Sequence, residues 1–224
     1  MPFFIKKKKT LYWLDMNSNQ HLETLIVEQD SLVYSINNEN MTAKIIGNYD
    51  VKSDITIPHF ICHQSKKYVI TSISEKAFQY SKKLKSIQFS SNWKLTIIEK
   101  DAFKQSSIKI LTIPPNLIKL EEEWCNEVYS LNKIIISPKN PYYKLYDGKL
   151  ILKKSSNKTN NYDVLVFCFR NTTSVTIPKF IKKIDPFAFD GCYFLNTIKI
   201  QPDSQLQTIG KGAFSASSVE FLVI

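Results

Sequence analysis

The pattern of apolar and polar positions repeats along this chain about every 23–25 residues. Each copy begins with two aliphatic residues three positions apart and continues, five positions later, with a Phe that usually follows Ala. That Phe position is filled by Phe78, Phe103, Cys125, Phe189 and Phe214. Repetition of this kind predicts a stack of similar units, in which each unit buries the apolar faces of its neighbours.

Each copy then runs into a second apolar segment with a period of two near its end. Alternation of this kind predicts a short strand with one buried face. Pro114, Pro138 and Pro178 follow such segments and end the strands, because proline cannot donate to a strand ladder. The apolar triplets are Leu84-Ile87-Phe89, Ile108-Leu111-Ile113, Leu131-Ile134-Ile136, Leu195-Ile198-Ile200 and Val219-Leu222-Ile224.

The period lies within the range of leucine-rich repeats. We therefore predict a right-handed leucine-rich-repeat solenoid, mostly β with short turns or helical pieces, and a short-stranded parallel sheet on one face. The Phe and Cys positions should stack as a ladder in its core.

The outward positions of those strands are the natural binding surface of a solenoid. We expect a partner-binding face at Ser86, Gln88, Ile110, Thr112, Lys133, Ile135, Thr197 and Lys199. Most outward positions are small and polar, and Ile110, Ile135, Phe221 and Val223 are the apolar exceptions. For these four residues, edge or cap contacts within the protein and partner binding are about equally expected.

The period is interrupted once, where the spacing between triplets rises to 64 residues. We expect a hairpin insertion over residues 140–173, with strands at 150–152 and 164–168 and a turn signal at Asp147-Gly148. Residues 31–224 form the solenoid, and its N-terminal cap (31–61) should contain a hairpin of 32–36 and 42–46. Residues 1–30 are an extension of uncertain structure, in which 10–27 fits a helix or a strand.

The net charge of +10 invites a nucleic-acid function. Of the 30 basic residues, however, only Arg170 is an arginine, and nucleic-acid recognition favours the planar guanidinium group. Because the lysines are also scattered, we expect a solvated surface and no nucleic-acid partner.

Few residues suggest chemistry. His59, Cys62 and His63 are the closest approach to a metal motif, but a zinc site needs four ligands, and a polar loop between Ile61 and Tyr68 is the simpler interpretation. Residues 121–123, all Glu, are most simply a solvated acidic patch. We expect no enzyme activity, metal, cofactor or small-molecule substrate.

The repeat resembles the BspA-like leucine-rich-repeat family. The resemblance rests on residues 184–195, on 209–214 and on 170–178, with Cys192 at the family's Cys position and Trp124-Cys125 departing from Ala-Phe. It covers residues 31–224. It implies a cell-surface antigen or adhesin that binds a host or matrix protein.

The N-terminus has no apolar segment of signal-peptide length, which taken literally indicates a cytoplasmic protein. An intracellular protein-protein interaction adaptor of the same fold therefore remains an alternative. The last strand, Val219 to Ile224, leaves an exposed parallel edge, and we expect either a longer protein or self-association through it.

Overall fold

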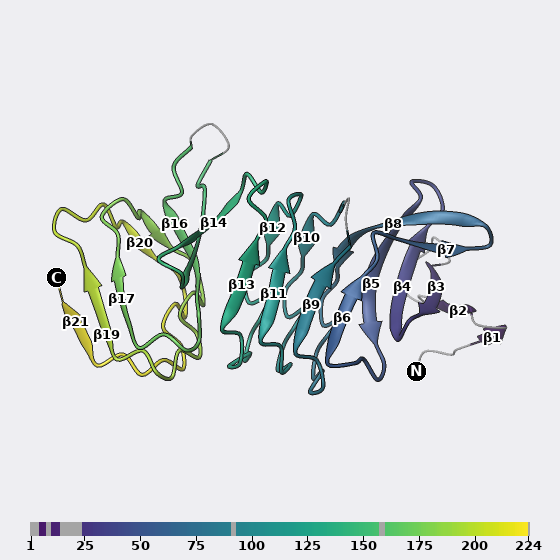
Figure 1. The fold of residues 1–224 in the computed structure, drawn as a ribbon, viewed down its shortest axis with the longest axis horizontal. Coiled ribbons are helices and arrows are strands. Elements are labelled where there is room, and N and C mark those ends of the chain that lie inside the picture. The colour runs from purple at the N-terminus through teal and green to yellow at the C-terminus, as the bar shows by residue number, and fades with distance from the viewer. Residues whose placement is uncertain (1–4, 8–9, 14–23, 91–92, 157–159, 224) are drawn as a thin grey trace.

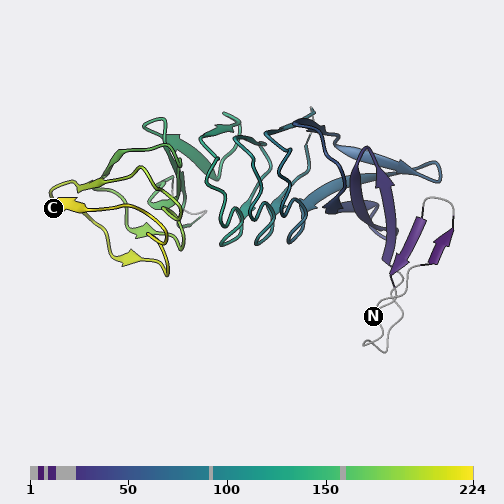
Figure 2. The ribbon, with the colours of Figure 1, turned by 90° about the horizontal axis from the view of Figure 1, so that it is seen from below.

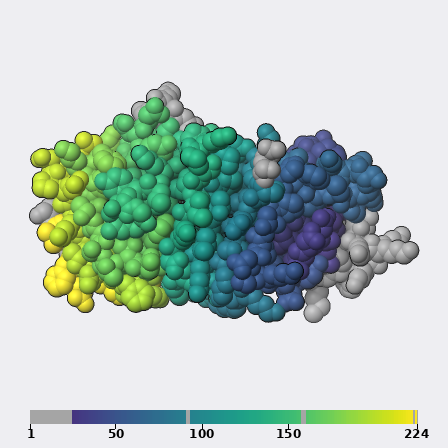
Figure 3. Space-filling view, viewed as in Figure 1, coloured from purple at the N-terminus to yellow at the C-terminus, as the bar shows by residue number. Residues whose placement is uncertain are grey.

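The protein is an elongated stack of strands. The computed structural model describes residues 5–7, 10–13, 24–90, 93–156 and 160–223, and within these ranges it contains no α-helix. Strands β1 (Ile5–Lys7) and β21 (Phe221–Val223) lie at opposite ends of the stack (Figure 1). Successive parts of the chain form successive bands along the long axis (Figure 3). The predicted mostly-β repeat solenoid is confirmed, and the connections predicted as turns or helical pieces are turns.

The Leu-x-x-Ile-x-Ile segments form parallel strands, as predicted. The first sheet contains β6 (Asp54–Ile57), β9 (Ser86–Phe89), β11 (Ile110–Ile113) and β13 (Lys133–Ile136). A second sheet contains β17 (Ser174–Ile177), β19 (Thr197–Ile200) and β21. We call the strands of these two sheets the first line. The first line is divided into a first block, residues 54–136, and a second block, residues 174–223.

The aliphatic pairs at the start of each repeat form a second line of parallel strands, which the sequence did not predict. In the first block, β8 (Lys66–Ile73) pairs with β10 (Ile97–Ile98), which pairs with β12 (Lys119–Leu120). In the second, β16 (Val164–Cys168) pairs with β18 (Lys183–Ile184), and β18 with β20 (Thr208–Ile209). Each repeat therefore contributes a strand to two opposite lines.

A tight turn around the Ala-Phe pair follows each second-line strand. The amide of Phe78 donates to the carbonyl of Ala102 (2.8 Å), and the amide of Phe103 to that of Trp124 (3.0 Å), so consecutive turns are also joined. Two positions of each turn are left-handed, at φ between 46° and 68°. The first position is occupied by Lys76, Asp101, Glu123, Phe187 and Gly212, and the second by Tyr80, Gln105, Glu127, Gly191 and Ala216.

The core between the two lines contains the predicted rings, but their ladder is interrupted. Phe78 and Phe103 stack at 5.4 Å between centroids, and Phe189 and Phe214 at 5.1 Å. Cys125 supplies no ring between these pairs, and the buried apolar residues form two separate clusters. The prediction of one continuous ladder is therefore wrong at Cys125.

The N-terminal part is antiparallel. Its strands are β1, β2 (Thr10–Trp13), β3 (Thr24–Gln29), β4 (Leu32–Asn37) and β5 (Thr42–Asn48). Strands β4 and β5 form the expected hairpin. Strands β2 and β3 fall in the stretch that fitted either a helix or a strand. Strands β1 and β2 lie apart from the end of the stack (Figure 2).

The insertion is a three-stranded antiparallel unit of β14 (Tyr143–Tyr146), β15 (Leu150–Lys153) and β16. The turn between β14 and β15 contains Asp147 and Gly148, both left-handed, at φ of 49° and 66°. That geometry is the one the Asp-Gly pair indicates. The division into extension, cap and insertion remains a prediction.

Candidate functional site

The outward strand positions lie in rows that run across each block. In the first block, Ser86, Ile110 and Lys133 share one row, and Thr112 lies beside Ile135. In the second, Thr197 lies between Ser174 and Phe221, and Lys199 between Thr176 and Val223. The candidates that are exposed or half-buried are Gln88, Ile110, Thr112, Lys133, Ile135, Thr197 and Lys199.

Ser86 differs from the other candidates because it is buried, with 5% of its surface exposed. Its hydroxyl donates a hydrogen bond to the Asp54 carboxylate on the neighbouring strand β6. This bond and one from Ser53 lower the pKa of Asp54. Ser86 therefore stabilises the packing of β6 on β9 and does not belong to the accessible face.

The face is not continuous. Strand β13 is the last strand of the first sheet, β17 is the first strand of the second sheet, and neither pairs with the other. Among the described residues, only the amide of Arg170, which donates to the carbonyl of Leu131 (3.2 Å), continues the backbone pattern beside β13. The insertion therefore occupies the position that the next repeat would take.

A groove lies between β13 and the insertion strand β14. Its volume is about 690 Å³, and its lining includes Ile135, Tyr143, Lys144, Leu145 and Phe169. Sites for ligands typically enclose about 300–1,000 Å³. The groove therefore combines part of the predicted face with residues that sequence reasoning did not include.

The wall of this groove is held by Asn140 and Tyr143. The buried Asn140 amide nitrogen donates to the carbonyls of Pro114 (2.8 Å) and Leu117 (3.1 Å), and its oxygen accepts the amides of Tyr142 and Tyr143. The Tyr143 hydroxyl accepts the amide of Leu120 at 2.7 Å, which caps the open edge of β12. Burial raises the pKa of Tyr143 to about 12, so this hydroxyl stays protonated.

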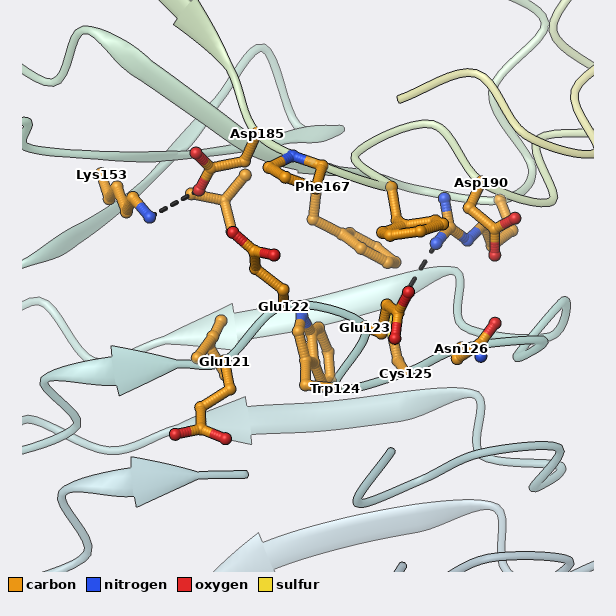
Figure 4. Close-up of a pocket in the computed structure, with 15 residues that line it drawn as sticks. Glu121, Glu122, Glu123, Trp124, Cys125, Asn126, Lys153, Phe167, Asp185 and Asp190 are labelled. Atoms are coloured by element: carbon orange, nitrogen blue, oxygen red, sulfur yellow. Dashed lines mark hydrogen bonds and ion pairs between the residues drawn. The ribbon is translucent and has the colours of Figure 1, made fainter. Parts of the chain in front are cut away.

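Inside the stack, the insertion closes the gap between the blocks. We call this region the seam: residues 121–127 on one side, 185–192 on the other, and 167–170 between them (Figure 4). The Phe167 ring lies 5.6 Å from Trp124, which itself contacts Phe103 at 6.0 Å. The amide of Cys168 donates to the carbonyl of Ala188 (2.9 Å), so the turn-to-turn hydrogen bonds continue through the insertion.

Arg170 is the chain's one arginine and lies in the seam with 3% of its surface exposed. Its guanidinium lies over the Phe167 ring at 4.3 Å. One of its nitrogens donates to the carbonyls of Cys168 and Ala188 and to the sulfur of Cys192, each at 3.4 Å. The other terminal nitrogen lies 4.0 Å from the sulfur of Cys125. The positive charge is thus compensated by carbonyl dipoles, sulfur and the ring.

The cysteines around Arg170 differ in acidity. The neighbouring Cys168 thiol and the charge of Arg170 lower the pKa of Cys192 to about 7 although burial opposes this. The neighbouring Cys192 thiol and burial raise the pKa of Cys168, and burial raises the pKa of Cys125 to about 12. Of these three cysteines, Cys192 is thus the one whose pKa is lowered.

Of the residues considered for metal binding, Cys62 and His63 lie on a hairpin and His59 directly precedes it, and the predicted polar loop between Ile61 and Tyr68 is wrong. Strand β7 (Phe60–His63) pairs with β8 through a two-residue turn at Gln64 and Ser65, both left-handed. No group of three potential ligands for a metal ion gathers in the described residues. In the same ranges, no helix has the length and the apolar character that crossing a membrane requires.

The acidic stretch 121–123 is only partly solvated. The Glu121 carboxylate accepts the amide of Lys100 at 3.0 Å, and Glu123 forms an ion pair with the Lys100 side chain. Glu122 alone of the three is exposed. The first and third glutamates therefore join one repeat to the preceding one.

The stacked parallel strands, the tight Ala-Phe turns and the apolar core between the two lines of strands define a repeat solenoid, a class of extended scaffold. The sequence profile of the BspA type leucine rich repeat region matches residues 42–147 and 148–224, in six copies. The chain belongs to this family.

Two solved structures show the same fold. The pneumococcal vaccine antigen PcpA has a TM-score of 0.56 and 18% identity, with 89% of this chain and 70% of PcpA covered. A leucine-rich repeat protein from Eubacterium ventriosum ATCC 27560 has a TM-score of 0.50 and 17% identity, with 87% and 66% covered. No curated protein matches the chain.

Proposed function

We propose that this chain is a non-enzymatic protein-binding scaffold that holds its partner against the outward face of the first-line strands. The observation that carries the proposal is the alignment of small polar and lysine side chains in rows across both blocks. Such rows present a repeated, rigid pattern to a partner at little entropic cost. The one arginine is buried, which further favours a protein over a nucleic acid as the partner.

The finer form of the proposal is a surface antigen or adhesin for a host or matrix protein. It draws support from the family and from the vaccine antigen that shares the fold. Fold alone does not determine function, so an intracellular adaptor is the competing function. Protease shaving of intact cells decides between them: cleavage with a cytosolic control intact supports the antigen, and protection until lysis supports the adaptor.

Binding by the face is tested with charge substitutions in each block. Gln88→Glu and Lys199→Glu change exposed outward residues, and Lys52→Glu changes an exposed lysine away from the strand rows. Proteins retained from matrix and cytosol extracts are quantified by mass spectrometry. We expect the face variants to lose a protein that Lys52→Glu retains, and equal retention by all three overturns the proposal.

A further inference from the structure

The outer edge of β13 has backbone groups with no partner strand. The amides of Lys133 and Ser137 donate toward the preceding repeat, to the carbonyls of Lys109 and Ile113. Neighbouring residues in a parallel strand direct their backbone groups to opposite sides. The amides and carbonyls of Ile134 and Ile136 therefore face the groove, where β13 pairs with no strand in the described residues.

The same opening in the second line is closed. There the Tyr143 hydroxyl accepts the amide of Leu120 at the edge of β12. In the described residues, the outer edge of β13 therefore has no partner strand, whereas the edge of β12 beside it is capped, so the edge of β13 is available for strand addition.

Apolar and basic side chains surround this edge. Ile135 and Leu145, on opposite walls, are 46% and 37% exposed, which gives two apolar anchors within one groove. Lys133 and Lys144 add positive charge, and the lining contains no Asp or Glu among the residues that the structure describes. The charge complementary to this lining is negative.

We infer that the groove binds an extended, acidic segment of the partner protein as an added strand on β13, with a carboxylate and a β-branched side chain two positions apart, so that both lie on the outward face with Lys133 and Ile135. This inference rests on the proposed scaffold function and specifies its ligand. The partner's backbone pairs with Ile134 and Ile136, its apolar side chains contact Ile135 and Leu145, and its carboxylates lie beside the two lysines.

The probe is a labelled seven-residue peptide, acetyl-Thr-Asp-Thr-Ile-Thr-Glu-Thr-amide, which carries Asp, Ile and Glu on one face; it is titrated with the full chain and followed by fluorescence anisotropy. Ile135→Asp should weaken binding at least about tenfold. The matched control is Ile118→Asp, since Ile118 is 50% exposed and lies outside the groove. Lys144→Glu should weaken binding more than Lys109→Glu, another exposed lysine.

Strand addition is separated from side-chain contact by N-methylation of alternate peptide residues. One of the two alternate sets points its amides at β13, so one methylated peptide should lose binding and the other should keep it. Equal binding by both methylated peptides, equal binding by a peptide with Lys in place of Asp and Glu, or no saturable binding overturns the inference. The scaffold proposal fails separately, when all face variants retain the same proteins.

Discussion

The junction between two ordinary repeats of the first block and the seam solve the same packing problem with different residues. At the ordinary junction, Phe78 stacks on Phe103, β10 pairs with β8 in the second line, and β11 pairs with β9 in the first. At the seam, β16 supplies the second-line strand and the turn contacts, while the first line stops at β13. The insertion is thus tolerated because it restores the interior and leaves its disruption at a surface edge.

The largest difference should appear when the ring stack is cut. Phe103→Ala removes a fully buried ring that contacts both Phe78 and Trp124, so we expect about 3–5 kcal/mol of destabilisation. Phe214→Ala, at a half-buried ring with one ring neighbour, should cost about half as much. Denaturant unfolding followed by circular dichroism measures both, and equal costs contradict the comparison.

At the seam, Arg170→Ala should destabilise by about 3 kcal/mol, because it removes hydrogen bonds to two buried carbonyls and the contact with Phe167. Arg170→Met fills the same space without a charge that must be desolvated, so it should recover more than half of the loss. Denaturation midpoints compare the two variants. If Met is as harmful as Ala, the charge rather than the packing of Arg170 holds the seam.

A subtler effect at the seam is a pH dependence. The pKa of Cys192 falls from its ordinary 9.0 to about 7 in the folded chain, so its thiolate is more stable folded than unfolded. Stability from this group is fully present above about pH 9 and is lost as the pH falls through 7. Relative to Cys192→Ser, the wild type should therefore gain stability from pH 7 to 9 under reducing conditions. An unchanged difference in denaturation midpoint over that range contradicts the assignment of the thiolate to Cys192.

The smallest expected effect concerns the turns, which both blocks share. Lys76 is exposed and has a φ of 60°. This left-handed backbone conformation has a steric cost of about 1–2 kcal/mol for a residue with a side chain and none for glycine. After the entropic cost of glycine, Lys76→Gly should stabilise by about 0.5–1 kcal/mol. Lys211→Gly, at an exposed turn residue that is not left-handed, should not stabilise, and a gain there would show that the turn strain is not the cause. Thermal melts measure both variants.

The sequence predicted what its periodicity encodes. The first-line strands, the Asp147-Gly148 turn and the interruption near residue 140 follow from spacing and turn chemistry. The second line was missed because four of its strands, β10, β12, β18 and β20, are two residues long, which is too short for an alternation to appear. The burial of Ser86 depends on Asp54, which lies 32 positions away and on a neighbouring strand.

The groove and the Arg170 cluster were missed for a related reason. Both arise where the insertion meets the repeats, and no single repeat contains their residues. The sequence nevertheless carried one signal, since a lone arginine in a lysine-rich chain marks a position that a lysine cannot fill.

The open edge of β13 also has a mechanical consequence. Tension between the two ends of the stack acts along the hydrogen bonds that join neighbouring repeats. The parallel pairs β11–β13 and β17–β19 each span four residues, whereas beside β13 the first line is continued by the Arg170 to Leu131 bond. Under load, the seam should therefore open before either block, and a pulling experiment should release the molecule as two separately unfolding lengths.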